Sequence, residues 1–471
     1  MKLKDKNIVV VGLGRTGLAT AAFLHQQGAR VRVSDTASEK ELGDAVDSLR
    51  KLGVRMETGS HRAALFQNAD LVVISPGVSH TIEPIVQAMD RGIPVIGEVE
   101  LASRFIKEPI IAVTGTNGKT TTTELLGRML KDSGLKVFVG GNIGNPLIEY
   151  VARKEPAQIV VAEISSFQLD TIAAFRPRVS VLLNITTDHL DRYPNFEAYA
   201  DSKFLIFKNQ QVEDVAVLNG ADPMIRAKTK RIKSQRLFFP SAAANEQGAV
   251  LNGKRIILNL DKLKRIQSEF QNPKSKIQNQ VHLDISKIHL HGQHNFENAA
   301  AASLAALAAG ATLEGIQNTL NHFKGLAHRL EHVATINAVQ YFNDSKATNV
   351  DGVVRALECF SKPVLLIMGG RDKGSDFKVL EGLARKHAKE LIVMGESAEQ
   401  IRSALGQLIP TKVAASMEEA VSTAYQNADP DDVVLLSPGC ASFDWYSSYA
   451  ERGDDFRRAV EKIKKRAANQ A

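Results

Sequence analysis

The sequence predicts an α/β protein of three successive blocks, each a parallel sheet covered by helices on both faces. Apolar runs that end in glycine alternate along the chain with segments of helical periodicity. Runs such as Leu71–Ser75 and Pro363–Gly369 are continuously apolar, which is typical of strands buried on both faces. At 471 residues, the chain has room for about three domains.

We place the three blocks at residues 1–105, 106–325 and 326–471. Their expected strands are 7–12, 30–34, 71–75 and 94–97 in the first block, 110–113, 159–163 and 179–184 in the second, and 339–342, 363–369, 391–395 and 433–437 in the third. Alternating stretches within 237–291 predict a small antiparallel addition to the second block. Within this region the polar stretch 267–280 is expected to be an exposed loop. An alanine-rich helix at 295–309 and a link at 323–329 follow.

Composition argues against several classes of protein. The net charge is +7, but the basic clusters at 228–233 and 462–466 lack interleaved aromatic residues, so we expect no nucleic-acid partner. No apolar run approaches the roughly 20 residues of a membrane span, and Gly12 interrupts the apolar segment near the N-terminus. Only Cys359 and Cys440 occur, which excludes a disulfide framework and fits the cytoplasm. Nothing in the sequence suggests an obligate oligomer, so we expect a monomer.

The strongest functional signal is the stretch from Ile111 to Thr120, IAVTGTNGKT. An apolar run stops at Gly115, and Lys119 and Thr120 open a segment with helical periodicity. A glycine loop between a strand and a helix N-terminus can surround a phosphate with N–H groups, while the lysine adds positive charge and the threonine can reach magnesium. The spacing Gly115-x-x-Gly118-Lys119-Thr120 is tighter than the usual one, because Val113 stands where a further glycine would be expected.

The first block carries a second glycine motif, Gly12-Leu-Gly-Arg-Thr-Gly17, directly behind a strand. With Asp35 at the end of the next strand, this pattern is the fingerprint of a Rossmann-like dinucleotide site. Gly77 follows another strand of the same sheet. The motif alone predicts a nucleotide at this sheet edge and leaves an NAD-dependent dehydrogenase open.

Polar residues also follow strands of the second and third blocks. Glu163 ends one strand, and Asp188 and His189 follow the next, which suggests a divalent cation beside the phosphate loop, with magnesium the default ion. The segment 343–349, NDSKATN, combines an acid, a base, hydroxyls and amides behind a strand. With Arg329 and Lys373, it would supply cations for phosphoryl transfer.

These motifs together resemble those of the Mur ligase family of peptidoglycan synthesis. The resemblance rests on GTNGKTT at 115–121, GNIG at 141–144, EISSFQL at 163–169, DHLDR at 188–192, GQHN at 292–295 and NDSKATN at 343–349. It implies an enzyme of cell-wall formation that uses ATP to join an amino acid to a UDP-sugar carboxylate through an acyl phosphate. The expected substrates are D-glutamate and UDP-N-acetylmuramoyl-L-alanine, with ATP and two magnesium ions.

The resemblance also implies residue roles. The expected catalytic residues are Lys119, Glu163, His189 and Lys203, and the expected metal ligands are Thr120, Glu163, His189 and a carbamylated Lys203. The expected ATP contacts are Gly115, Thr116, Asn117, Gly118, Lys119, Thr120, Thr121, Asn295, Asn298, Arg329, Asp344 and Lys346. The expected UDP-sugar contacts are Gly14, Arg15, Thr16, Asp35, Thr36, Gly77, Asn142, Ser165 and His189, and those of D-glutamate are Thr348, Lys373, Ser442 and Phe443.

Alternatives remain open at this point. A sister ligase of the same pathway, or a folylpolyglutamate synthetase, shares the ATP module. A dehydrogenase fused to an ATPase domain would explain the first glycine motif. A nucleotide-binding regulator without catalysis would leave Lys119, Glu163, His189 and Lys203 without a purpose.

Overall fold

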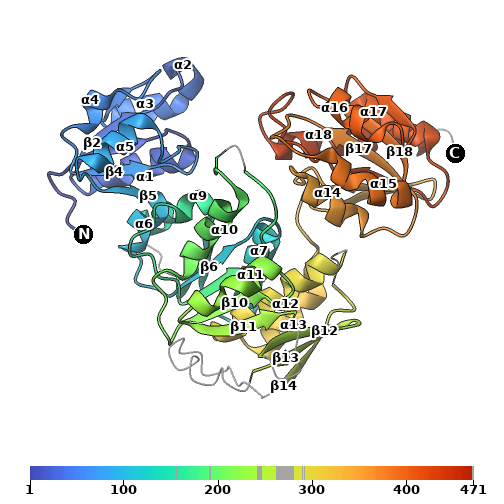
Figure 1. Cartoon of the computed structure of the whole chain (residues 1–471), viewed down its shortest axis with the longest axis horizontal. Coiled ribbons are helices and arrows are strands. Elements are labelled where there is room, and N and C mark those ends of the chain that lie inside the picture. The colour runs from blue at the N-terminus through green and yellow to red at the C-terminus, as the bar shows by residue number, and fades with distance from the viewer. Residues whose placement is uncertain are drawn as a thin grey trace. The chain divides into compact units, whose positions relative to one another are not determined.

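The computed structural model describes residues 1–153, 157–189, 192–240, 247–260, 280–288, 290 and 292–468. Its strands form three separate sheets, coloured blue, then cyan to yellow, then orange along the chain (Figure 1). The chain divides into two compact units: the first contains residues 1–185, 197–287 and 297–321, and the second contains 186–196, 288–296 and 322–471. The predicted α/β fold class is confirmed. The expected loop at 267–280 lies outside the described residues, apart from Gln280.

The first sheet is entirely parallel, with the order β3-β2-β1-β4-β5. Its strands are β1 (Asn7–Val11), β2 (Arg30–Ser34), β3 (Arg55–Glu57), β4 (Leu71–Ile74) and β5 (Val95–Gly97). The helices of this block are α1 (Arg15–Gln26), α2 (Glu39–Leu42), α3 (Asp44–Lys51), α4 (Ala63–Phe66) and α5 (Glu83–Asp90). The strand order reverses between β1 and β4, and such a reversal opens a ligand crevice at the carboxyl edge of a parallel sheet.

The second sheet has the order β14-β13-β12-β11-β10-β9-β6-β8-β7. Its strands are β6 (Ile110–Thr114), β7 (Val137–Gly141), β8 (Ile159–Glu163), β9 (Val179–Leu182), β10 (Val215–Asn219), β11 (Gln235–Phe239), β12 (Gly248–Asn252), β13 (Arg255–Asn259) and β14 (Gln280–Asp284). Its helices include α7 (Lys119–Asp132), α8 (Leu147–Ala152), α9 (Ser166–Leu169), α10 (Phe196–Phe204), α11 (Pro223–Lys228), α12 (Gln293–Ala308) and α13 (Leu313–His322). The alanines of α12 are fully buried, since small side chains let a helix pack closely.

The antiparallel addition begins later than the sequence predicts. Among the described strands of this sheet, pairing is antiparallel only for β12 with β13 and for β13 with β14. The residues from 237 to 239 belong instead to β11, which runs parallel to β10. Their side chains are buried, as expected for a strand inside the parallel part of a sheet.

The third sheet has the order β15-β16-β20-β17-β18-β19, parallel except for the β15–β16 pair. Its strands are β15 (Glu331–Ile336), β16 (Val339–Asn343), β17 (Val364–Gly369), β18 (Ala388–Met394), β19 (Thr411–Val413) and β20 (Val433–Leu436). The helices are α14 (Val350–Leu357), α15 (Glu381–His387), α16 (Ala398–Leu405), α17 (Met417–Asn427) and α18 (Tyr449–Ala468). Leu366 and Met368 of β17 join one hydrophobic cluster, and Leu365 and Ile367 join another, so both faces are covered.

In the part of the chain that the structure describes, no helix is both long enough and apolar enough to cross a membrane.

Helix α6 (Glu98–Ser103) follows β5 and carries two buried carboxylates. Glu100 accepts hydrogen bonds from the backbone N–H groups at 173–175 and pairs with Arg104 at 2.8 Å. Glu98 is only 2% exposed, and its Oε1 atom accepts from the N–H of Ile148. Its Oε2 atom has no hydrogen-bond partner among the described residues. Burial raises the pKa of Glu98 to about 7, although the N–H of Ile148 opposes that shift.

We therefore predict that Glu98 makes the protein less stable as pH rises. The folded pKa lies above the ordinary glutamate value of 4.5, so its contribution is fully present below pH 4.5 and is lost as pH rises through about 7. Glu98→Gln should reduce the loss of unfolding free energy between pH 5 and pH 8 by roughly 2 to 3 kcal/mol, measured by urea unfolding. Glu100→Gln is the matched control on the same helix and should destabilise the protein at pH 8. An unchanged pH dependence in Glu98→Gln would contradict this prediction.

Candidate active site

The predicted phosphate loop connects β6 to α7 with backbone angles that favour glycine. Gly115 has a φ of 150° and Gly118 a φ of 84°. A Cβ atom on Gly115 would lie 2.9 Å from the Cβ atom of Leu183, and one on Gly118 would clash with the side chain of Asn298. Both positions therefore need glycine, because the backbone is left-handed and its neighbours are close.

Asn184, just beyond β9, holds the loop in shape. Its side-chain Oδ1 accepts from the N–H of Asn117 at 2.8 Å, and its Nδ2 donates to the carbonyl of the same residue at 3.0 Å. Its own carbonyl accepts from the N–H of Thr116 at 2.9 Å. Three hydrogen bonds thus fix two loop residues against the neighbouring strand end. Asn184 begins the mostly polar segment 184–189 behind this strand, of which only Asp188 and His189 had an expected role.

Two lysine side chains converge on one carbonyl of this loop. Lys119, the first residue of α7, donates to the carbonyl oxygen of Gly115 at 2.9 Å and to that of Thr116 at 2.7 Å. Lys203, on α10, also donates to the Gly115 carbonyl, at 2.8 Å. Positive charge therefore gathers where a helix N-terminus and loop N–H groups favour an anion.

Lys203 is buried, with 1% of its surface exposed, so it is not an exposed helix lysine. Its ammonium lies 4.5 Å from the centre of the Tyr199 ring. The Tyr199 hydroxyl is 3.2 Å from the hydroxyl of Thr116 in the loop. Helix α10 is fixed by Lys228, which pairs with Glu197 and with Asp201. The helix thus presents Lys203 to the phosphate loop from a supported position.

Glu163 ends β8 next to β6, since Val113 and Glu163 are paired in register. It is 2% exposed, and its Oε1 atom accepts from the Nδ2 of Asn142 at 2.8 Å. Its Oε2 atom has no hydrogen-bond partner within the described residues. A buried carboxylate oxygen without a partner is unfavourable unless a cation meets it, so this residue fits a divalent metal ion. No three His, Cys, Asp or Glu side chains gather as a metal site in the described ranges.

Asp188 and His189 belong to the second compact unit, whereas Glu163, Thr120 and Lys203 belong to the first. His189 has a left-handed φ of 54°. Its N–H donates to the Oδ1 of Asp188 at 2.9 Å, and the Oδ2 of Asp188 accepts from the Nδ2 of Asn349 at 3.1 Å. The Oδ1 of Asn349 accepts from Gly352 and so caps α14. Asn349 therefore connects the His189 segment to the third sheet's helices.

A cavity of about 480 Å³ in the second unit contains part of the expected amino-acid site. Thr348 and Lys373, both expected D-glutamate contacts, line it together with His189. The other two expected contacts do not line this cavity: Ser442 is buried, and Phe443 is 61% exposed. The structure therefore brings together two of these four residues.

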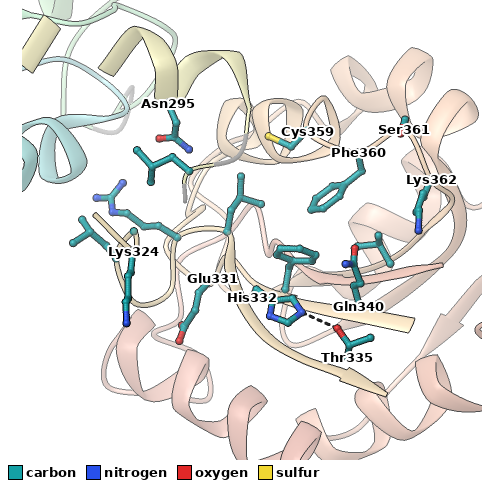
Figure 2. A pocket seen from close by; sticks show the side chains of 17 residues that line it. Asn295, Lys324, Glu331, His332, Thr335, Gln340, Cys359, Phe360, Ser361 and Lys362 are labelled. Atoms are coloured by element: carbon teal, nitrogen blue, oxygen red, sulfur yellow. Dashed lines mark hydrogen bonds between the residues drawn. The ribbon is translucent and has the colours of Figure 1, made fainter. Parts of the chain in front are cut away.

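A second cavity in the same unit, of about 670 Å³, is lined by Asn295 and Arg329, two expected ATP contacts. Figure 2 shows Asn295 at one end of this cavity and Lys362 at the other. Leu290, Leu326 and Phe342 add apolar surface to a lining that also holds the cations Lys324, Arg329 and Lys362. Apolar surface beside several cations suits a flat heterocycle bearing phosphates.

Asp344, Lys346 and Asn298, the other ATP contacts expected outside the phosphate loop, do not line this second cavity. Asp344 is held by the N–H of Leu330 and by the hydroxyl of Ser437, and burial raises its pKa to about 7. Lys346 lies over the ring of Tyr449, with its ammonium 3.7 Å from the ring centre. Asn298 packs against Gly118 of the phosphate loop instead.

Cys359 also lines this second cavity, but neither cysteine suits thiol chemistry. Burial raises the pKa of Cys359 to about 12 and that of Cys440 to about 11. Both thiols therefore stay protonated at neutral pH, and a protonated thiol is a poor nucleophile.

The expected UDP-sugar contacts lie mostly where strands of the first sheet end. Gly14, Arg15 and Thr16 open α1, Asp35 and Thr36 follow β2, and Gly77 follows β4. Both carboxylate oxygens of Asp35 accept backbone N–H groups, from Leu13 and from Ala37, so this side chain holds the turn between β1 and α1. The Arg15 guanidinium donates hydrogen bonds to the side chains of Asn145 and Glu149, which belong to the second block. Ser165 caps α9.

Family models match all three blocks of the chain. They are described as a MurD-like N-terminal domain at residues 6–97, a Mur ligase middle domain at 113–306 and a Mur ligase glutamate ligase domain at 328–440. A protein of Desulfosudis oleivorans, named UDP-N-acetylmuramoylalanine–D-glutamate ligase, is 50% identical over 464 residues, 98% of each chain. A protein of the same name from Desulfatibacillum aliphaticivorans is 51% identical over 460 residues, 98% of this chain and 99% of that one.

The chain belongs to the Mur ligase family. Solved structures agree at the level of the fold. A pseudomurein peptide ligase type C from Methanothermus fervidus has a TM-score of 0.61 at 22% identity and covers 98% of this chain and 100% of its own. A MurF ligase from Thermotoga maritima in complex with ADP has a TM-score of 0.61 at 17% identity, covering 94% and 96%.

Within this Mur ligase, the structure gathers the phosphate loop, Glu163, Asn142 and Lys203 around one point of the first unit. It gathers His189, Thr348 and Lys373 around one cavity of the second unit. Sequence reasoning missed the hydrogen bonds of Asn184 and of Asn349. Both asparagines lie in polar runs behind strands, which was the available signal, but their partners depend on tertiary structure.

We predict that Lys119→Ala removes most ligase activity without unfolding the protein. The ammonium acts where charge develops on the transferred phosphate, and the loss of such a group lowers turnover by roughly a hundredfold or more. ADP release measures the activity, and thermal unfolding checks the fold. Lys131→Ala, in the last turn of the same helix, is the matched control and should keep normal activity. Near-normal turnover in folded Lys119→Ala would refute the role of this lysine.

Proposed function

We propose that this chain uses ATP to join D-glutamate to UDP-N-acetylmuramoyl-L-alanine in the synthesis of peptidoglycan precursors. The observation that carries the proposal is identity of 50% and 51%, over 98% of the chain, to proteins named for this ligation. The gathering of positive charge at the phosphate loop supports the use of a nucleotide triphosphate. We expect the reaction to run in the cytoplasm and in a monomer.

The proposed division of labour follows the three blocks. Residues 1–105 bind the UDP-sugar, residues 106–325 bind ATP, and residues 326–471 bind the amino acid. The residues assigned to these ligands are those that the family resemblance implies. In support, most residues of each group lie at strand ends or in loops of the block assigned to them, where parallel α/β sheets bind their ligands. The exceptions are the UDP-sugar contacts Asn142, Ser165 and His189, which lie in the second block, and the ATP contacts Arg329, Asp344 and Lys346, which lie in the third.

In the first step, the terminal carboxylate of the UDP-sugar attacks the γ-phosphorus of ATP and ADP leaves. The Lys119 ammonium and the N–H groups of the loop from Gly115 to Thr121 stabilise the negative charge that grows on the phosphate oxygens. In the second step, the neutral amine of D-glutamate attacks the acyl phosphate carbon and releases phosphate. Arg329 and Lys346 supply further positive charge for the phosphates.

Thr120, Glu163, His189 and a carbamylated Lys203 would hold two magnesium ions, which would neutralise phosphate charge. Glu163 fits this role because one of its buried carboxylate oxygens has no other partner among the described residues. Lys203 fits because its ammonium shares the Gly115 carbonyl with Lys119. Two ammonium groups on one oxygen repel each other, whereas carbamylation of Lys203 would replace one of these cations with an anion.

D-Glutamate carries a side-chain carboxylate that needs a cation and hydroxyl donors. The cavity that contains Lys373 and Thr348 offers both. We propose that Lys373 binds that carboxylate and that Ser442 and Phe443 complete the site.

We predict that the amino-acid preference is strict. With ATP and UDP-N-acetylmuramoyl-L-alanine present, D-glutamate should drive ADP release, while L-glutamate, L-alanine and meso-diaminopimelate should drive little. Lys373→Ala should raise KM for D-glutamate roughly tenfold or more, because it removes a charge-assisted hydrogen bond. Lys378→Ala, an exposed lysine nearby, is the matched control. Equal turnover with L-alanine would sink the proposed substrate and favour another ligase of this family.

We also predict that Lys203→Ala is nearly inactive and that short carboxylic acids partly restore it. The added acid would fill the anionic position left by the carbamate. ADP release with and without acetate or propionate measures the effect, and Lys208→Ala, an exposed neighbour, serves as the control. Full activity of Lys203→Ala without added acid would show that the lysine has no such role.

A further inference from the structure

Arg452, in the first turn of α18, is one of the largest side chains that the fold buries completely, with 1% of its surface exposed. Its guanidinium makes five hydrogen bonds. The Nε atom donates to the hydroxyl of Ser345 at 3.0 Å, and the Nη atoms donate to the carbonyls of Ser345 at 2.9 Å, Gly369 at 3.3 Å, Cys440 at 3.1 Å and Ala441 at 3.3 Å. No carboxylate forms an ion pair with Arg452 in the described part of the chain.

A buried cation held only by neutral oxygens is unusual, because buried charges are normally paired. Burial lowers the pKa of Arg452 to about 10, with the opposite influence of Asp444 only a smaller cause, so the side chain stays protonated at neutral pH. The carbonyl dipoles replace the water that the charge has lost. An arginine that served packing alone would not need five oriented acceptors.

The acceptors of Arg452 lie at the carboxyl ends of three different strands. Ser345 follows β16, Gly369 ends β17, and Cys440 and Ala441 lie beyond β20. The loops after β17 and β20 are also joined to each other, since Arg371 and Ala441 exchange two backbone hydrogen bonds of 2.8 and 3.0 Å. Arg452 therefore holds three loops in one arrangement at the edge of the third sheet.

Each of these loops carries residues assigned to the reaction. Lys346 and Thr348 follow Ser345, Lys373 follows Gly369, and Ser442 follows Ala441. Gly370 adds a steric requirement: its φ is 136°, and a Cβ atom there would lie 2.9 Å from an Nη atom of Arg452.

The contact with Ser345 also bears on Lys346. The Ser345 hydroxyl donates to the carbonyl of Tyr449 at 2.8 Å while it accepts from Arg452. The next residue, Lys346, places its ammonium over the Tyr449 ring. Arg452 and Tyr449 both belong to the first turn of α18. The hydrogen bonds of these two residues to Ser345 therefore fix the backbone of the neighbouring Lys346 relative to the Tyr449 ring.

We propose that Arg452 is a positioning residue for the amino-acid half of the reaction, holding the three loops that present the D-glutamate contacts Thr348, Lys373 and Ser442. One of these loops also carries the ATP contact Lys346. The proposal rests on the proposed ligation of D-glutamate. It goes further in naming the buried side chain on which the shape of that site depends.

The test measures steady-state kinetics of Arg452→Lys and Arg452→Met for each substrate. KM for D-glutamate should rise roughly tenfold in Arg452→Lys, which keeps the charge but loses donors, and roughly a hundredfold in Arg452→Met. KM for UDP-N-acetylmuramoyl-L-alanine should stay within about twofold in both. Simple destabilisation would lower the amount of active enzyme and the apparent kcat without changing either KM.

A spectroscopic measurement covers variants that fold poorly or turn over too slowly. Trp445 is the single tryptophan of the chain, 41% exposed, and lies in the loop that follows Ala441. Quenching of its fluorescence by acrylamide should increase in Arg452→Met and less in Arg452→Lys. Ser345→Ala removes the hydroxyl that accepts from the Nε atom of Arg452. Its quenching and its KM for D-glutamate should lie between those of the unmutated enzyme and those of Arg452→Met.

Arg457→Met is the matched control. Arg457 lies on the same helix but is half-buried and pairs with the carboxylates of Glu331 and Asp454 rather than with the three loops, so its loss should change neither KM nor quenching. Unchanged KM for D-glutamate and unchanged quenching in Arg452→Met would overturn the proposal. Failure of the unmutated enzyme to ligate D-glutamate would overturn the proposed function instead. The quenching result would still test whether Arg452 holds the loops in place.

Discussion

Backbone groups that lose their strand partners at the carboxyl ends of parallel sheets must find other hydrogen bonds, and buried polar side chains supply them here. Asp35 accepts two N–H groups at the first sheet, Asn184 bonds Asn117 in both directions at the second, and Arg452 donates to four carbonyls at the third. The ligand loops of this Mur ligase begin at those same edges. The shape of each loop therefore depends on one or two side chains that need not touch a substrate.

The charges around the phosphate loop suit the phosphate and the divalent cation that we propose bind there. Lys119 and Lys203 donate to the same carbonyl, while Glu163 keeps one buried oxygen without a partner among the described residues. Neither feature is favourable for the protein alone, because like charges repel and a bare buried carboxylate oxygen is poorly solvated. Both become favourable with phosphate and a divalent cation bound. Such stored strain is typical of a site prepared for charge that appears during the reaction.

Much of the fold could be predicted from the sequence because a parallel strand buried on both faces has a continuous apolar run. The runs at β1, β6, β8, β17 and β20 were found in this way. The strands β3, β7, β10, β15 and β19 were missed. β3 and β19 have only three residues each, and β7 and β15 are only partly buried. β10 is fully buried, so its apolar run was an available signal that was overlooked. The phosphate loop was recognised from local spacing. The burial of Lys203 and the hydrogen bonds of Arg452 could not be predicted from the sequence. Their partners are mainly carbonyl groups whose positions depend on the folded chain.

Asn349 shows why a motif can carry more than the contacts expected of it. The segment from Asn343 to Asn349 was interpreted as a cluster of ligand contacts, yet its last residue uses both ends of its side chain within the protein. The Oδ1 atom caps α14, and the Nδ2 atom holds Asp188, which in turn accepts from the N–H of His189 in its left-handed conformation. A single amide thus ties the position of α14 to that of the His189 backbone. Since Thr348 and His189 line the same cavity, its shape on both sides depends on that amide.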